Sequence, residues 1–377
     1  MTFGRGALIA GALGAAALAV ELRLSRSTRP ISDAWQHVPV APRGSTKLGI
    51  SFRPRQAEAF DLQPAVVLDD LLTRPFHVIR LGVYWDRVEP RPGVWDFGEV
   101  DRQLDAAERA GKEILLGVGA LKTFGYPEYF VPAHRLSRPL PEGRLVTPNE
   151  HRDLLAAACE QVERVVERYR GRPAVTAWQV EHEAVDPLGF EHSWRLDAAF
   201  VEAEVVAVKR ADSTRPVLLN GYLAGGWLEG VAQRWRTRDQ GDSLDLARGL
   251  ADWMGVDSYP RHALAGLGPW TLYADGGSWE RWRRGRLLRP GQRLVVTEGQ
   301  AEPWEALTVP PNAAGRVPAS CPPERLIGNY NRWVGWAQRS GAPLEAYLFW
   351  GAEYWLLRAR SGDPGYLAAF ERVLAES

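Results

Sequence analysis

The sequence predicts a single (β/α)8 barrel over residues 47–377, and two observations support that prediction. Short apolar segments with strand character alternate with helical segments along the whole stretch. Polar residues suited to chemistry stand at the ends of several of these segments, as expected where parallel strands open on one face. A doubly wound sheet is the competing fold, and it is disfavoured because no GxGxxG or P-loop motif follows any segment.

The predicted elements follow from local patterns. Apolar runs predict strands at 48–52, 78–83, 113–118, 178–183, 217–220, 253–256, 294–297 and 346–350. Helical spacing and stop signals predict helices at 64–72, 98–110, from the capping residue 149 to about 170, 193–210, 323–340 and 364–375. The segment 120–147 is a long loop with many aromatic residues, a length typical of binding walls or lids.

The first 46 residues are predicted to lie outside the barrel. The apolar run 7–20 follows Arg5 and would span roughly 21 Å as a helix, less than the ~30 Å core of a bilayer. That length fits a signal peptide, with a small-residue cleavage pattern at 17–19, while an uncleaved membrane anchor and a buried helix are the alternatives. We therefore expect export to the periplasm or the exterior, with 1–20 as signal peptide or membrane anchor and 21–46 as a linker.

The composition argues against several classes of protein. A formal net charge of 0 gives no footprint for nucleic acid. Cys159 and Cys321 stand alone, without a CxxC or a His/Cys cluster, so no structural metal site is expected, and their pairing is left open. The histidines lack metalloenzyme spacing and no GxSxG motif occurs. The 16 tryptophans, several near predicted strand ends, suit either a core or the apolar faces of sugar rings.

Two predicted strands each end in a glutamate. Residues 178–183 read Trp-Gln-Val-Glu-His-Glu and end at Glu183, and residues 293–298 read Arg-Leu-Val-Val-Thr-Glu and end at Glu298. In a parallel barrel both carboxyls would face one pocket, which is the arrangement that glycoside hydrolysis requires. Glu181 is a rival for Glu183 because it falls on the same face of the predicted strand, but Glu183 is nearer the pocket.

In their order along the chain, these motifs resemble clan A of the glycoside hydrolases, the retaining (β/α)8 enzymes. The resemblance extends over most of the chain after residue 47 and includes the strand-2 region of families 5, 39 and 42. The matching segments are Val78-Ile79-Arg80-Leu81 with 84–97, the strand-4 motif 178–183, the strand-6 segment Asp257-Ser258-Tyr259-Pro260, the strand-7 motif Val296-Thr297-Glu298 and the strand-8 pair Phe349-Trp350.

The resemblance implies a retaining glycoside hydrolase that acts on an oligo- or polysaccharide without a cofactor or metal. Glu183 would be the general acid/base and Glu298 the nucleophile, which Arg80 and Tyr259 would keep ionised. The substrate-binding residues would be Arg80, His182, Tyr259, Trp350 and Trp85.

The chain departs from the clan pattern at two positions. His182 stands where the clan has an asparagine that binds the sugar 2-hydroxyl, and Asp257 stands where family 5 often has histidine. Histidine also donates a hydrogen bond, but its reach and protonation differ from those of asparagine. Two alternatives therefore stay open: a carbohydrate-binding barrel with impaired catalysis, and a transglycosylase built from the same residues.

Overall fold

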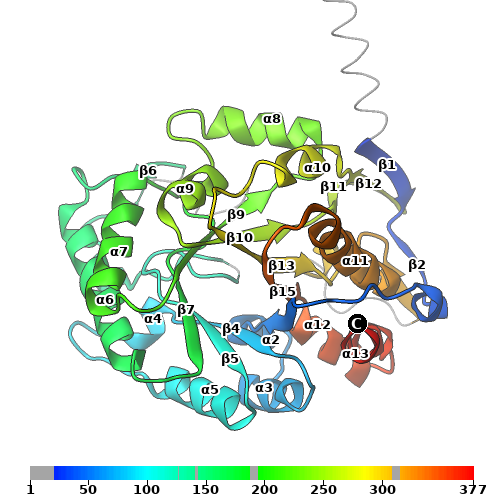
Figure 1. The fold of residues 1–377 in the computed structure, drawn as a ribbon, viewed down its shortest axis with the longest axis horizontal. Helices are drawn as coiled ribbons and strands as arrows, with labels where there is room; N and C mark the ends of the chain where they lie inside the picture. Colours follow the sequence, from blue (N-terminus) through cyan, green and yellow to red (C-terminus); the bar gives the residue numbers. More distant parts are fainter. Residues whose placement is uncertain (1–20, 126, 141–142, 187–193, 308–314) are drawn as a thin grey trace, which may run out of the picture.

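The computed structural model describes residues 21–125, 127–140, 143–186, 194–307 and 315–377, and within them eight parallel strands close into a barrel (Figure 1). Neighbours around the barrel are neighbours along the chain, and helices connect them, so the predicted (β/α)8 fold is confirmed. The barrel strands in order are β3 (Lys47–Ser51), β4 (Val78–Gly82), β5 (Glu113–Gly117), β7 (Val175–Gln179), β9 (Val217–Leu223), β10 (Trp253–Ser258), β13 (Arg293–Gln300) and β15 (Leu344–Trp350).

Helices surround the barrel and cover its outer face (Figure 1). α3 and α11 span the predicted ranges, and each begins at a proline, whose fixed φ suits the first helical position. The helices are α2 (Pro54–Ala59), α3 (Pro64–Leu72), α4 (Trp85–Val88), α5 (Gly98–Arg109), α6 (Arg152–Tyr169), α7 (Ala198–Ala211), α8 (Trp227–Arg236), α9 (Ser243–Leu250), α10 (Ser278–Arg284), α11 (Pro323–Ser340), α12 (Ala352–Arg360) and α13 (Gly365–Glu376). None of the helices described is long and apolar enough to cross a bilayer.

The core has two layers. A small apolar cluster fills the barrel interior, and a much larger one lies between the strands and the helices. Because the strands are buried on both faces, they read as continuous apolar runs in the sequence. The interior cluster consists of Val78, Leu115, Ala177, Leu218, Val295, Ala346 and Leu348.

The fourth barrel strand is shorter than predicted. β7 ends at Gln179, and residues 180–186 form a loop. Both Glu181 and Glu183 have positive φ in this loop, at 51° and 44°, so they do not share a strand face as expected. Non-glycine residues at positive φ are uncommon and cluster at functional sites.

The segment 21–46 differs from the predicted linker because part of it pairs with sheet edges. β1 (Leu22–Arg26) pairs with β12 (Trp270–Asp275) of a hairpin whose other strand is β11 (Arg261–Leu267). β2 (Thr28–Pro30) pairs with β14 (Arg316–Pro318). These pairs are held by backbone hydrogen bonds between strand edges, and the composition of a segment does not reveal such pairing. The predicted signal or anchor segment 1–20 lies outside the described residues.

Candidate active site

The Glu298 carboxylate is held by two charge-assisted hydrogen bonds. Arg80 on β4 donates from Nη1 to Oε1 at 2.8 Å, and the Tyr259 hydroxyl donates to Oε2 at 2.6 Å. Burial raises the pKa of Glu298, while the Arg80 guanidinium and the Tyr259 hydroxyl act in the opposite direction. The strand β13 therefore presents a buried carboxylate with both oxygens satisfied as an anion.

Arg80 is fixed by its surroundings. Its Nε donates to the Gln179 side chain at 2.7 Å, its guanidinium carbon lies 3.8 Å from the Phe124 ring centroid, and its Nη2 is 3.3 Å from His182 Nδ1. The residue is completely buried. A guanidinium that is confined in this way loses little freedom when it binds an anion.

Glu183 occupies the loop after β7 in very different surroundings. Its backbone carbonyl accepts from Lys122 Nζ at 2.6 Å, and its N–H donates to Asn220 Oδ1 at 3.3 Å, so the main chain is anchored on both sides. Burial raises its pKa well above the usual range, and the carboxyls of Glu128, Asp186 and Glu298 raise it further. The protonated form of the Glu183 carboxyl is therefore favoured relative to that of an exposed glutamate.

Glu181, the rival candidate, is committed to the backbone. Its two carboxylate oxygens accept from the N–H groups of Leu121 at 2.9 Å and Lys122 at 2.5 Å. The remaining neighbour is Glu204, which shares a hydrogen bond with it. This pattern makes Glu181 the group that shapes the 120–125 loop, and it favours Glu183 as the acid.

His182 is a neutral imidazole in this site. Burial lowers its pKa well below the usual value, and the nearby charges of Arg80 and Lys122 lower it further. Its Nδ1 is 2.9 Å from Asn220 Nδ2 and 3.3 Å from Arg80 Nη2, and both of these groups donate. The proton is therefore on Nε2, which is 3.8 Å from Glu128 Oε1.

Asn220 and Asp257 join the two halves of the site. Asn220 Oδ1 accepts from Gln179 Nε2 at 3.0 Å, while Asn220 Nδ2 donates to Asp257 Oδ2 at 2.5 Å. Asp257 Oδ1 accepts from the Thr297 hydroxyl at 2.6 Å. Burial raises the pKa of Asp257 well above the usual range, and Glu298 and Glu183 add to the effect. The sequence offered one signal for Asn220, a polar residue that ends a predicted strand.

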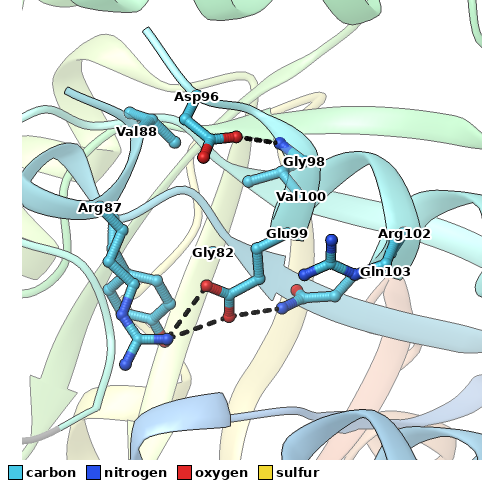
Figure 2. A pocket seen from close by; sticks show the side chains of 10 residues that line it. Gly82, Arg87, Val88, Asp96, Gly98, Glu99, Val100, Arg102 and Gln103 are labelled. Atoms are coloured by element: carbon cyan, nitrogen blue, oxygen red, sulfur yellow. Dashed lines mark hydrogen bonds and ion pairs between the residues drawn. The ribbon is translucent and has the colours of Figure 1, made fainter. Parts of the chain in front are cut away.

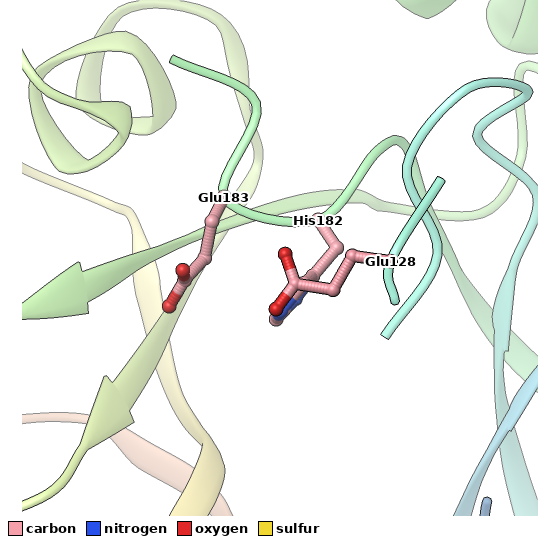
Figure 3. Close-up of side chains that lie close together, drawn as sticks. All are labelled: Glu128, His182 and Glu183. Carbon is pink, nitrogen blue, oxygen red and sulfur yellow. The ribbon is translucent and has the colours of Figure 1, made fainter. Parts of the chain in front are cut away.

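Glu128 was not among the predicted site residues, although it lies in the long aromatic loop. It has a φ of 75°, and the ligand atoms of Glu128, His182 and Glu183 lie within 4.8 Å of one another (Figure 3). Its Oε2 is buried and has no hydrogen-bond partner among the described residues. Burial raises the pKa of Glu128 to about 8, with Lys122 opposing the shift.

An aromatic cluster forms the wall beside Glu298. Trp350 ends β15 and packs with Phe124 and Tyr259, and Tyr222 and Trp304 lie against these three rings. The guanidinium carbon of Arg53 lies 4.2 Å from the centroid of the Trp350 ring. This stacking fixes the plane of the indole.

Histidine and carboxylate atoms close enough to share a cation occur in two described groups: Glu128–His182–Glu183 and His182–Asp257–Glu298. In the second group, Arg80 already supplies the positive charge to Glu298, and His182 Nδ1 faces two donors. The geometry of this second group therefore fits a cation-free carboxylate better than a metal centre.

Comparison with known proteins shows that part of this chain is similar to glycoside hydrolases. The model of glycoside hydrolase family 42, described as beta-galactosidase, matches residues 72–236. The beta-galactosidase bgaB of Geobacillus kaustophilus is 30% identical over 117 residues, which cover 28% of this chain. The aligned part is only 17% of the length of that relative.

Solved structures share the fold. The Thermobacillus composti GH10 xylanase superposes with a TM-score of 0.52 at 17% identity, covering 88% of this chain and 97% of the xylanase. Xylanase 10B from Thermotoga maritima gives a TM-score of 0.52 at 17% identity and covers 88% and 95% of the two chains. The chain has the barrel of the clan A glycoside hydrolases. The predicted resemblance to that clan is thereby confirmed.

Within this glycoside hydrolase barrel, most of the predicted site residues come together. Arg80 and Tyr259 bind Glu298, and His182 lies between the two predicted catalytic glutamates, 3.7 Å from Glu298 Oε1. Trp350 belongs to the adjoining aromatic wall.

Trp85 is placed differently from the prediction. Its ring is fully buried in the main core, and its Nε1–H donates to Glu89 at 2.8 Å. A ring that is packed on all sides and has its only donor committed is a structural element, so a substrate-binding role for Trp85 is not supported. Its place in the sequence, directly after a barrel strand, did not distinguish the two roles.

A cavity of about 220 Å³ lies between β4 and α5, and none of the predicted site residues lines it (Figure 2). Arg87 Nη1 donates to both oxygens of Glu99, and Gln103 donates to the same carboxylate at 3.1 Å. Because these polar groups are paired with one another, the cavity offers little to a ligand.

Proposed function

We propose that this protein is a retaining glycoside hydrolase with Glu298 as nucleophile and Glu183 as general acid/base. The supporting observation is the contrast between two buried carboxyls. Glu298 faces a guanidinium and a phenol, whereas Glu183 faces other carboxyls. Environments that push two pKa values apart are how an enzyme assigns its acid and its nucleophile.

In the first step, Glu298 attacks the anomeric carbon while the proton of Glu183 passes to the leaving oxygen. The glycosidic bond breaks, and an ester between the sugar and Glu298 forms. Glu183, now a carboxylate, then takes a proton from water, and the water oxygen displaces Glu298. Both residues return to their starting forms, and the anomeric configuration is retained.

The neighbouring groups suit a sugar in this position. The Nε2–H of neutral His182 supplies the donor that an asparagine amide supplies elsewhere in the clan, and its Nδ1 is held by Asn220. Arg80 and Tyr259 bind the nucleophile in its anionic form, so the site does not need a cation. These features favour catalysis over the binding-only alternative, because a site without turnover needs no such difference between its carboxyls.

We propose a β-galactoside as the first substrate class to test. The family model and the Geobacillus relatives carry the name beta-galactosidase. The xylanases share only the fold and give no guide to the sugar.

The decisive experiment compares Glu183→Gln and Glu298→Gln on an aryl β-galactoside with a good leaving group. The phenolate of such a substrate leaves without protonation by an acid, so Glu183→Gln should release a burst of one phenolate per enzyme. Turnover should then be slow, because water attacks the glycosyl-enzyme without a general base. Glu298→Gln should release none. Glu202→Gln, an exposed substitution on α7, is the isosteric control and should match the wild type.

Proton NMR of the first product formed by the wild type gives the stereochemical result. A β-anomer supports double displacement, and an α-anomer would rule it out. Full turnover by both glutamine variants would reject the assignment of the two glutamates. Sugar–acceptor products in place of free sugar would favour the transglycosylase.

A further inference from the structure

Helix α8 carries an apolar stripe on its outer side. Leu228, Val231 and Trp235 are 47%, 58% and 67% exposed, and their spacing of three and four residues places them on one face. The inner side is packed, because a Cβ added at Gly230 would lie 2.2 Å from the ring of Trp279. The stripe therefore faces away from the barrel.

Three exposed tryptophans in this region have an arginine over the ring, while Trp227 packs edge-on against Trp279. The guanidinium carbon of Arg238 lies 4.4 Å from the Trp235 ring centroid. For Trp282 of α10, the corresponding distance is 4.8 Å to Arg286, which follows that helix. For Trp270 in the β1–β12 sheet, it is 5.5 Å to Arg26. We call the outward surface of α8, α10 and the β11–β12 hairpin the arginine–tryptophan face.

Acidic groups on the two helices of this face point inward. Glu229 of α8 accepts from the Gly225 N–H at 3.0 Å and pairs with His262 at 3.2 Å. Glu280 of α10 is buried and pairs with Arg332 at 2.9 Å. The exposed charged residues of these helices are therefore arginines, namely Arg234, Arg236 and Arg281.

The apolar N-terminal segment joins the barrel at this same face. Glu21 caps α8, since its carboxylate accepts from the Trp227 N–H at 2.8 Å, and it also accepts from the Ser278 hydroxyl at 2.6 Å at the start of α10. β1 begins at the next residue, and Figure 1 shows β1, α8, α10, β11 and β12 together at one side of the molecule. The apolar run 7–20 is thus covalently attached beside the stripe.

We propose that the arginine–tryptophan face docks on an anionic lipid bilayer. Tryptophan and leucine on one side of a helix, with arginine at its edges, are the composition that lies in a membrane interface. The aromatic rings would enter the headgroup layer while the arginines pair with lipid phosphates, and the N-terminal run would add a second attachment. The proposal goes beyond the hydrolase activity and does not depend on it.

Docking through this face would also orient the candidate active site. α8 follows β9, and the β11–β12 hairpin follows β10, so the face is built on the carboxyl ends of the strands. Tyr259, which binds Glu298, lies directly before that hairpin. A docked molecule would therefore hold its catalytic end close to the membrane surface.

The test is flotation of the full chain with vesicles of phosphatidylcholine and phosphatidylglycerol. Replacing the stripe by Leu228→Ser, Val231→Ser and Trp235→Ser together should lower the partition coefficient by about tenfold or more. The matched control replaces three exposed valines elsewhere, Val66, Val94 and Val206, by serine and should bind as the wild type does. Vesicles of phosphatidylcholine alone should bind less wild-type protein.

Hydrogen exchange of the wild type gives a second measurement, which reports contact at this face even if the N-terminal segment alone is sufficient for flotation. Amides of 227–236 and 261–275 should exchange more slowly with vesicles present, while those of 64–72 should not change. Equal flotation of the stripe and control variants, together with unchanged exchange, would overturn the proposal. If light scattering shows that the wild type and the control variant are dimers and the stripe variant is a monomer, the face would be assigned to a second copy of the chain instead. Both variants should keep wild-type turnover of a soluble glycoside, which separates this test from that of the active site.

Discussion

At Glu183 and Glu298, similar burial produces two different carboxyls because the neighbours differ in charge. Arg80 and Tyr259 stabilise the anion at Glu298, whereas Glu128 and Asp186 penalise it at Glu183. Each of these neighbours comes from a different segment of the chain. The proposed division between acid and nucleophile therefore depends on the assembled site and not on either glutamate alone.

The pH dependence of kcat/KM should reflect this division. Activity needs Glu298 ionised and Glu183 protonated, so it is lost below the pKa of Glu298 and above the pKa of Glu183. The pKa values of both carboxyls are raised, and that of Glu183 more strongly. The bell-shaped plot of kcat/KM against pH should therefore lie at higher pH than for two ordinary carboxyls. A pH–rate profile on a soluble glycoside measures it, and an acid optimum near pH 4 would contradict the assignment.

Glu128→Gln should narrow the pH range of activity by moving its alkaline limit to lower pH. Its carboxylate is the largest charge effect raising the pKa of Glu183, so removing the charge lowers that pKa and moves the alkaline limb to lower pH. The acid limb should move less, because Arg80 and Tyr259 dominate at Glu298. Glu202→Gln is the control, and an unchanged alkaline limb in Glu128→Gln would show that the two carboxyls do not interact.

At the scale of one element, β13 positions Glu298, the proposed nucleophile, by close packing. Gly299 follows Glu298, and a Cβ there would lie 2.3 Å from the hydroxyl and the adjoining ring carbon of Tyr347 on β15. Tyr347 is fully buried, and its ring packs against those of Tyr330 and Phe349. A side chain at position 299 would therefore crowd the strand beside the Glu298 carboxylate.

Gly299→Ala should destabilise the protein by about 1–3 kcal/mol, as overpacking of a core does, and should lower kcat by displacing Glu298. Urea unfolding and steady-state kinetics measure the two effects. Gly328→Ala is the matched control, since a Cβ there meets nothing within 4 Å inside α11, and it should stabilise by up to about 1 kcal/mol. Equal stability of the two variants would refute the packing argument.

For the whole molecule, Arg53 joins the first and last parts of the barrel. It follows β3 and makes hydrogen bonds of 2.8 and 3.0 Å to Glu302 after β13, and of 2.9 and 2.6 Å to Glu353 at the start of α12. All three side chains are buried. The same guanidinium stacks on Trp350, so barrel closure and the aromatic wall depend on one residue.

Arg53→Met should therefore lower the free energy of unfolding by about 3–5 kcal/mol, because it leaves two buried carboxylates without a counter-charge. Urea denaturation measures the loss, and Arg339→Met, an exposed position on α11, is the control. The double variant Glu302→Gln/Glu353→Gln in the Arg53→Met background should recover part of the stability. Failure to recover any would mean that packing of the arginine stem, and not the unpaired charge, sets the cost.

Much of this architecture was predictable from local patterns. Apolar runs located every barrel strand, and helical patterns located α3 and α11. The end of β7 was predicted too late because Val180 continues the apolar run, although the backbone turns to positive φ at Glu181. Such a turn is imposed by partners, here the N–H groups of Leu121 and Lys122.

The sequence by itself determined the class of fold and pointed to Glu183 and Glu298 as the candidate pair, because the spacing of apolar residues and the polar residue after each apolar run are local features of the chain. Only the tertiary structure decided what each side chain does there. It buried Trp85 in the core, brought Glu128 and Asn220 to the site, and paired residues 22–30 with strands far along the chain. The electrostatic surroundings, the desolvation and the packing of a side chain depend on residues distant in sequence. These contacts form only when the barrel closes.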